Sequence, residues 1–146
     1  VAVFLSFDGE LDTQPLIEQL WRAGKRVYLP VLHPFSAGNL LFLNYHPQSE
    51  LVMNRLKIHE PKLDVRDVLP LSRLDVLITP LVAFDEYGQR LGMGGGFYDR
   101  TLQNWQHYKM QPVGYAHDCQ LVEKLPVEKW DIPLPAVVTP SKVWEW

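Results

Sequence analysis

The sequence predicts a single α/β domain over residues 1–146, with a mainly parallel open sheet flanked by helices. Short apolar, β-branched runs recur along the chain and end at proline or at polar turns, as buried strands do. A stretch of helical periodicity connects the first two of these runs. A turn-rich middle section predicts a short antiparallel or edge-strand segment in addition, and the chain length suits one domain with its own core.

The start of the chain predicts a strand–helix–strand unit. Residues 1–6 are apolar and β-branched and end in a polar turn, which indicates a buried strand. Asp12 and Thr13 offer an N-cap for the helix, and Gly24 is placed to end it. Residues 27–31 predict the second strand. Because a helix connects the two strands, we expect them to be parallel.

The middle of the chain has weaker patterns. Residues 40–45 predict a short strand that is antiparallel or at an edge, and residues 50–56 a helical turn. Residues 60–70 are polar and irregular. Residues 74–79 predict another buried strand, which Pro80 ends.

The second half predicts a helix and then short strands. The helix spans residues 98–109, and a short strand follows at residues 112–116. Residues 119–124 predict a weak helical turn, and residues 136–140 the last strand. The tryptophan-rich end at residues 143–146 either folds back on the body of the domain or covers a pocket.

Composition excludes several function classes. A net charge of −3 gives no general nucleic-acid surface, and no apolar run is long enough to span a membrane. The single cysteine, Cys119, excludes an internal disulfide and fits a reducing compartment. We therefore expect a cytoplasmic monomer that binds a small molecule and neither nucleic acid nor membrane.

A glycine-rich run is the most informative stretch. Four of the nine glycines fall within residues 92–96, where their backbone N–H groups are uncovered by side chains and form a cradle for an anion. Arg90 and Arg100 add positive charge, and Asp99 adds a ligand for Mg2+. The run follows the strand at residues 74–79, at the end where open sheets bind ligands. This predicts a nucleotide phosphate site; the alternative is a flexible turn between loop and helix.

The common phosphate-binding motifs do not fit. A P-loop needs a Gly-Lys pair followed by Ser or Thr, which is absent. The dinucleotide fingerprint needs a glycine where Phe97 stands. The other motifs of a protein kinase are absent as well.

The run instead resembles the signature of the 5-formyltetrahydrofolate cyclo-ligase (methenyltetrahydrofolate synthetase) family, and it is similar to the enterobacterial members. It reads Gly88-Gln89-Arg90-Leu91-Gly92-Met93-Gly94-Gly95-Gly96-Phe97-Tyr98-Asp99-Arg100. The resemblance continues at residues 4–6, 10–13, 60–61 and 125–127 and at Asp131, so it covers essentially the whole chain.

The resemblance implies an enzyme that uses ATP and Mg2+. It converts 5-formyltetrahydrofolate to 5,10-methenyltetrahydrofolate, with release of ADP and phosphate, by phosphorylation of the formyl oxygen and ring closure by N10. It also implies site residues. Those at ATP are Arg90, Leu91, Gly92, Met93, Gly94, Gly95, Gly96, Phe97 and Tyr98. Those at the folate are Leu5, Glu10, Met93, Gly94, Gly95, Gly96 and Phe97, and the metal ligands are Asp99 and Asp131. We assign catalytic roles to Arg90, Tyr98 and Arg100, the last as a phosphate contact.

The sequence departs from the family pattern in three places. Phe97 stands where many members have tyrosine, and Gly95 where some have lysine. The family usually begins with a basic helix that reaches the ATP phosphates, and we expect this chain to lack it. Two alternatives therefore stay open: an enzyme like the sugar-phosphate isomerases, and a non-catalytic folate- or nucleotide-binding protein.

Overall fold

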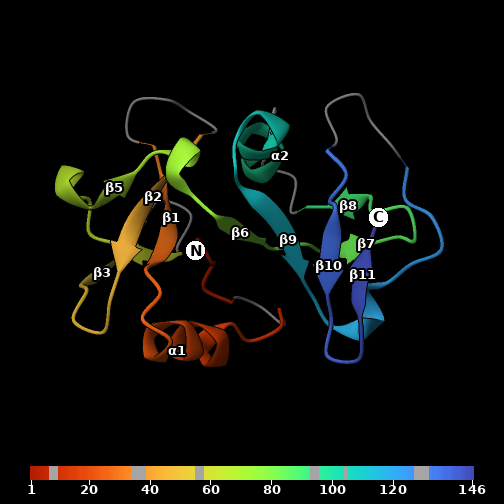
Figure 1. Cartoon of the computed structure of the whole chain (residues 1–146), viewed down its shortest axis with the longest axis horizontal. Helices are drawn as coiled ribbons and strands as arrows, with labels where there is room; N and C mark the ends of the chain where they lie inside the picture. Colours follow the sequence, from red (N-terminus) through yellow and green to blue (C-terminus); the bar gives the residue numbers. More distant parts are fainter. Residues whose placement is uncertain (7–9, 34–38, 55–57, 93–95, 104, 127–131) are drawn as a thin grey trace.

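A computed structural model describes residues 1–6, 10–33, 39–54, 58–92, 96–103, 105–126 and 132–146 (Figure 1). The helices in this part of the chain are α1 (Gln14–Arg22) and α2 (Phe97–Leu102), with the 3-10 turns η1 (Val65–Asp67), η2 (Leu71–Arg73), η3 (Trp105–His107) and η4 (Asp118–Gln120). The strands are β1 (Val27–Leu32), β2 (Leu40–Tyr45), β3 (Leu51–Met53), β4 (His59–Pro61), β5 (Val68–Leu69), β6 (Val76–Thr79), β7 (Ala83–Phe84), β8 (Arg90–Leu91), β9 (Gln111–Tyr115), β10 (Ala136–Val138) and β11 (Val143–Glu145). No helix in these ranges combines the length and the apolar character that crossing a bilayer requires.

A mixed sheet runs through the molecule in the order β11-β10-β9-β6, the segment around Ala2, and then β1-β2-β5. Ala2 forms parallel bridges to Leu77 on one side and Tyr28 on the other, and so joins the two halves. Its N–H donates to the Val76 carbonyl at 2.9 Å, and its own carbonyl accepts from the Ile78 N–H at 2.8 Å. The mainly parallel α/β sheet is confirmed, and so is the parallel start of the chain.

Antiparallel pairs occupy the two ends of this sheet. At one end β2 pairs with β1 and β5, and at the other β11 pairs with β10. The pairings between β10, β9, β6, the Ala2 segment and β1 are all parallel. In chain order the parallel segments lie 2-1-3-4-5, so the winding reverses between the Ala2 segment and β6.

Successive residues of the central strands belong to different cores, because side chains alternate between the faces of a sheet. Leu77 belongs to a buried cluster that includes Leu102 of α2. Its neighbour Ile78 belongs to a second cluster, with Val3 and with Ile17 of α1. The two helices lie on opposite sides of the strands in Figure 1. Each therefore contributes to a different core.

The start of α1 is tied to the end of the Ala2 segment. Thr13 occupies the N-cap position, but its hydroxyl donates to the Phe4 carbonyl at 2.6 Å and does not cap the helix. The Asp12 carboxylate accepts instead from the Gln14 N–H at 3.0 Å. Of the two residues expected to cap the helix, Asp12 therefore bonds its first residue, and Thr13 bonds the segment around Ala2. The helix ends before Gly24, whose φ is 73°.

The expected helical turn at residues 50–56 is wrong. Residues 51–53 form β3, which pairs antiparallel with β4. The Glu60 carboxylate holds this hairpin, because it accepts from the Asn54 amide at 2.9 Å and from the Leu32 N–H of β1 at 3.1 Å. A local helical preference is weak over so few residues, and the pairing overrides it. Residues 60–70, expected to be irregular, contribute to β4, η1 and β5.

The helix expected at residues 98–109 is too long. It ends at Leu102, and Gln103 is already extended, with φ −54° and ψ 125°. Trp105, in the 3-10 turn η3, and Met110 then pack on the same core as Leu102. A strand was also missed, because the chain continues past β10 into β11. The tryptophan-rich end therefore folds back on the body of the domain.

Candidate functional site

Arg90 is the centre of the site. It begins β8, and its side chain is only 5% exposed. Its Nε donates to the carbonyl of Pro80, which follows β6, at 2.9 Å, and its Nη1 lies 3.3 Å from the Asp99 carboxylate. Its guanidinium also stands over the Tyr98 ring, 5.7 Å from the ring centroid. A buried positive charge is therefore fixed between the end of β6 and the first turn of α2.

The glycines at the two ends of the loop let arginines pack on the backbone. A Cβ at Gly92 would lie 2.9 Å from Nη2 of Arg90, and a Cβ at Gly96 would lie 3.3 Å from Nη1 of Arg100. Gly96 also has φ 71°, a conformation that favours glycine. Residues 93–95, for which Met93, Gly94 and Gly95 were expected to contact ATP and folate, lie outside the described residues.

Tyr98 places a buried hydroxyl beside these charges. In the described part of the chain, this hydroxyl has no hydrogen-bond partner. Burial raises the pKa of Tyr98 well above its ordinary value; Arg90 acts in the opposite direction, and the carboxylate of Glu10 adds to the increase. The hydroxyl therefore stays protonated and is a donor.

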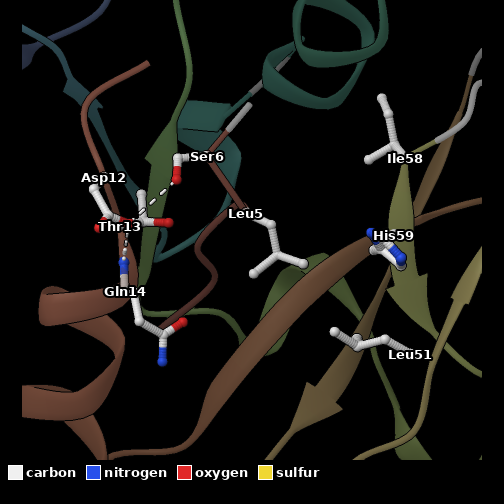
Figure 2. A pocket seen from close by; sticks show the side chains of 8 residues that line it. All are labelled: Leu5, Ser6, Asp12, Thr13, Gln14, Leu51, Ile58 and His59. Carbon is white, nitrogen blue, oxygen red and sulfur yellow. Dashed lines mark hydrogen bonds between the residues drawn. The ribbon is translucent and has the colours of Figure 1, made fainter. Parts of the chain in front are cut away.

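Leu5 lies in a separate feature, a pocket of about 630 Å³ (Figure 2). This volume is in the range of small-molecule sites, about 300–1,000 Å³. One wall comes from the end of the Ala2 segment and the start of α1, and the other from β3, β4 and the residue before β4. Its lining residues are Leu5, Ser6, Asp12, Thr13, Gln14, Leu51, Ile58 and His59.

The structure thus gathers the expected residues in two places. Arg90, Tyr98 and Asp99 lie together, and Leu5 lines the pocket. The second wall of the pocket was missed by the sequence analysis, because residues 50–56 were assigned to a helical turn. Residues 51–53 are apolar throughout, so no alternation indicated a strand there, and the pairing with β4 is a contact between segments.

Asp99 is the described carboxylate that was expected to bind Mg2+. The side chain of Asp99 is 19% exposed, so its carboxylate reaches solvent while one oxygen faces Arg90. Mg2+ is usually bound through one or two carboxylates together with substrate phosphates and water, and Asp99 fits that role. Within the described ranges, no group of three or more His, Cys, Asp or Glu side chains is arranged around a metal position. Asp131 lies outside those ranges.

Comparisons of the sequence with known proteins agree on one family. The model of the 5-formyltetrahydrofolate cyclo-ligase family matches residues 1–140. The 5-formyltetrahydrofolate cyclo-ligase of Escherichia coli (strain K12) is 99% identical over 146 residues, which are 100% of this chain and 80% of the relative. The one from Haemophilus influenzae is 60% identical over 134 residues, which are 92% of this chain and 72% of the relative.

A solved structure has the same fold. The NMR structure of 5,10-methenyltetrahydrofolate synthetase from Aquifex aeolicus superposes with a TM-score of 0.79 at 31% identity, and covers 99% of this chain and 70% of that one. The similarity thus extends over both groups of site residues.

Proposed function

The chain belongs to the 5-formyltetrahydrofolate cyclo-ligase family, and we propose that it closes 5-formyltetrahydrofolate to 5,10-methenyltetrahydrofolate with consumption of ATP in the presence of Mg2+. Membership makes it a ligase of folate one-carbon metabolism. The main support for this reaction is the family match over residues 1–140 together with 99% identity to a relative over the full chain. The buried cluster around Arg90 supports the location of the ATP site.

The proposed chemistry needs no covalent nucleophile from the protein. A formyl amide carbon is a poor electrophile, and its oxygen is a poor leaving group. Transfer of the γ-phosphoryl group of ATP to that oxygen activates the carbon, and N10 then attacks it and phosphate leaves. Such a reaction needs positioning, neutralisation of charge and exclusion of water.

We assign the phosphate-binding work to the residues around the glycine loop. Arg90 supplies a fixed positive charge, and Arg100 supplies a second one beside Gly96. The backbone N–H groups of residues 91–97 bind ATP. Asp99, together with Asp131, would hold Mg2+, which neutralises charge on the phosphates when bound.

The folate is assigned to the pocket and to the residues between the pocket and Arg90. Leu5, Leu51 and Ile58 give the pocket apolar walls that suit aromatic rings. Glu10 is an acceptor for the N–H groups of the pterin. Residues 93–97 are assigned to the place where the folate and ATP meet, and Tyr98 donates from its buried hydroxyl at the ATP site.

We also propose that the chain acts as a cytoplasmic monomer on this small-molecule substrate, without nucleic acid or membrane. A net charge of −3 supports the absence of nucleic acid, and one exposed cysteine, Cys119, fits a reducing compartment.

The test follows the ultraviolet absorbance of the methenyl product. Product that forms only when 5-formyltetrahydrofolate, ATP and Mg2+ are all present is the expected result. Turnover of a phosphosugar without ATP would favour the isomerase alternative. Folate or nucleotide binding without product would favour the non-catalytic binder.

The metal assignment has its own variant, Asp99→Asn. Alanine would remove the carboxylate that pairs with the buried Arg90, whereas asparagine keeps an acceptor at the same place and removes the charge that Mg2+ needs. We expect the Mg2+ concentration for half-maximal turnover to rise at least about tenfold. Asp75→Asn is the control, since Asp75 pairs with Lys109 at 2.9 Å on the surface. An unchanged Mg2+ dependence in Asp99→Asn would remove Asp99 from the metal site.

A further inference from the structure

The turn between β7 and β8 contains a fully buried carboxylate. Asp85 is 0% exposed. Its Oδ1 accepts from the N–H groups of Tyr87 and Gln89, at 2.9 and 3.0 Å. Its Oδ2 accepts from the N–H of Leu125, at 3.0 Å. A turn carboxylate is ordinarily solvated, and one that is buried must be matched by donors, as this one is.

This carboxylate connects the turn to a distant part of the chain. Leu125 lies 40 residues further along the sequence. The other side of the turn is fixed as well, because the Leu134 N–H donates to the Gly88 carbonyl at 2.8 Å. Gly88 has φ 80°, and a Cβ there would lie 2.7 Å from the Leu134 carbonyl. Residues 125 and 134 are thus both held by the same short turn.

The turn leads directly into Arg90. Phe84 and Arg90 are paired across β7 and β8, and the Asp85 N–H donates to the Gln89 carbonyl at 3.2 Å. The Arg90 side chain is 5% exposed and bonds both Pro80 and Asp99. A buried side chain with fixed partners on two sides tolerates little movement of its backbone.

We propose that Asp85 is a positioning residue for the nucleotide site: its carboxylate fixes the turn that presents Arg90 and ties that turn to Leu125. The inference rests on the proposed function in one respect, the assignment of Arg90 to ATP. A displacement of about 1 Å at such a group is enough to reduce turnover about 100-fold.

The test is Asp85→Asn in the full chain. Asparagine has the same size, but it offers an acceptor on one side only, so it satisfies either the turn or Leu125 and not both. We expect the KM for ATP to rise about tenfold or more, while the KM for 5-formyltetrahydrofolate stays within about twofold. Asp85→Ser is the second variant if Asp85→Asn does not fold. Its hydroxyl still accepts from the turn but is too short for Leu125, and the same shift is expected.

Asp118→Asn is the matched control. Asp118 accepts from the Ser141 hydroxyl at 2.6 Å and from its N–H at 3.4 Å, at an exposed position. This variant makes the same substitution where a single carboxylate oxygen accepts both bonds, which asparagine can keep, so we expect it to change neither KM. Equal KM shifts for ATP and folate in Asp85→Asn, or no shift, would overturn the positioning role.

A binding measurement separates this inference from the proposed function. ATP affinity is measured by calorimetry, and amide exchange is followed at Tyr87, Gln89 and Leu125. If the wild-type protein turns over and Asp85→Asn binds ATP with the same affinity as the wild type, the positioning role of Asp85 is overturned and the proposed function stands. Wild-type protein without turnover would overturn the function, and weaker ATP binding with faster exchange in the variant would still support the inference. Wild-type protein that binds no ATP would overturn both.

Discussion

The Tyr98 hydroxyl is buried without a hydrogen-bond partner in the described residues, whereas the Arg90 guanidinium over its ring is bonded on two sides. A buried polar group that lacks a hydrogen bond costs free energy in the folded state. Such a cost is acceptable where a ligand later supplies the missing partner. The unpartnered hydroxyl therefore supports a ligand position at this point more directly than the charges do.

Tyr98→Phe is expected to have opposite effects on stability and on ligand binding. Removal of the unpartnered hydroxyl leaves the free energy of unfolding unchanged or raises it by up to about 1 kcal/mol. The stabilisation by bound ATP and 5-formyltetrahydrofolate decreases. The KM rises about tenfold for whichever of these two ligands accepts a hydrogen bond from the hydroxyl. Thermal unfolding with and without each ligand measures both effects. A variant that is less stable without ligand but binds normally would show that the hydroxyl has a structural partner.

The same hydroxyl predicts how stability depends on pH. Burial raises the pKa of Tyr98 in the folded chain above its value in the unfolded chain, about 10. As the pH rises above about 10, the unfolded chain loses this proton while the folded chain keeps it, so the unfolded state is favoured. Wild-type stability should therefore fall more steeply above about pH 10 than that of Tyr98→Phe. Urea unfolding of both proteins from about pH 8 to 11 gives the comparison, and parallel curves would contradict the assignment.

At the scale of elements, two glycines distinguish backbone strain from a steric clash. Gly24 after α1 has φ 73° and nothing within 4 Å of an added Cβ, whereas Gly88 has φ 80° and the Leu134 carbonyl at 2.7 Å. We expect Gly24→Ala to cost about 1–2 kcal/mol of unfolding free energy from its backbone alone. Gly88→Ala should cost more by at least about 1 kcal/mol, because the neighbouring carbonyl must move as well.

Chemical denaturation of the two variants measures this difference. Equal losses in Gly24→Ala and Gly88→Ala would mean that the contact between the turn and Leu134 is loose. The result bears on the site, since the same turn precedes Arg90. It also tests the hairpin independently of any activity.

The sequence predicted those elements whose pattern is strong over a long stretch. In the opening unit the helix was correct, because Ile17 and its helical neighbours repeat at a regular spacing. The parallel order was correct as well, although residues 1–6 form only parallel bridges at Ala2 and not a full strand. Residues 50–56 were too few for the periodicity to distinguish a turn of helix from a strand, and a contact from Glu60 decided the outcome. The helix beginning at Phe97 was overextended because the packing of Met110 on the core is a tertiary effect.

The site residues, too, were predicted where the local sequence pattern is strong. The glycine signature located Arg90, Tyr98 and Asp99, which the structure brings together. Asp85 looked like an ordinary turn residue, because its partner Leu125 is distant in the sequence and no local pattern reveals it. What sequence reasoning missed are contacts between segments, on which both the pocket and the turn depend.

At the scale of the molecule, the position of the site follows from the sheet. The order of parallel segments reverses between the Ala2 segment and β6, and ligands in such sheets gather at the carboxyl ends of the strands at that point. Leu5 follows one of these two segments and lines the pocket, and Pro80 follows the other and binds Arg90. Both groups of site residues therefore lie where the topology places a ligand.

The continuity of that sheet predicts that the chain unfolds as one unit. Ile17 and Leu102 are both fully buried, but they belong to different cores on the central strands. Ile17→Ala and Leu102→Ala should each lower the free energy of unfolding by about 2–5 kcal/mol. Because Ala2 joins the two halves through parallel bridges, both variants should shift the same transition. Val65→Ala is the control, since Val65 is 83% exposed and should change stability by less than about 0.5 kcal/mol.

Urea unfolding, followed by tryptophan fluorescence and by far-ultraviolet circular dichroism, tests whether the chain unfolds as one unit. Coincident curves with a common shift support a single domain over residues 1–146, because a cooperative unit loses both cores together. If Ile17→Ala moved one transition and Leu102→Ala another, the halves on either side of Ala2 would be separate units. The site draws on both halves, with Leu5 and Leu51 from one and Arg90 from the other, so separate unfolding would also disassemble it in steps. Cooperative unfolding would instead make ligand binding stabilise both cores equally.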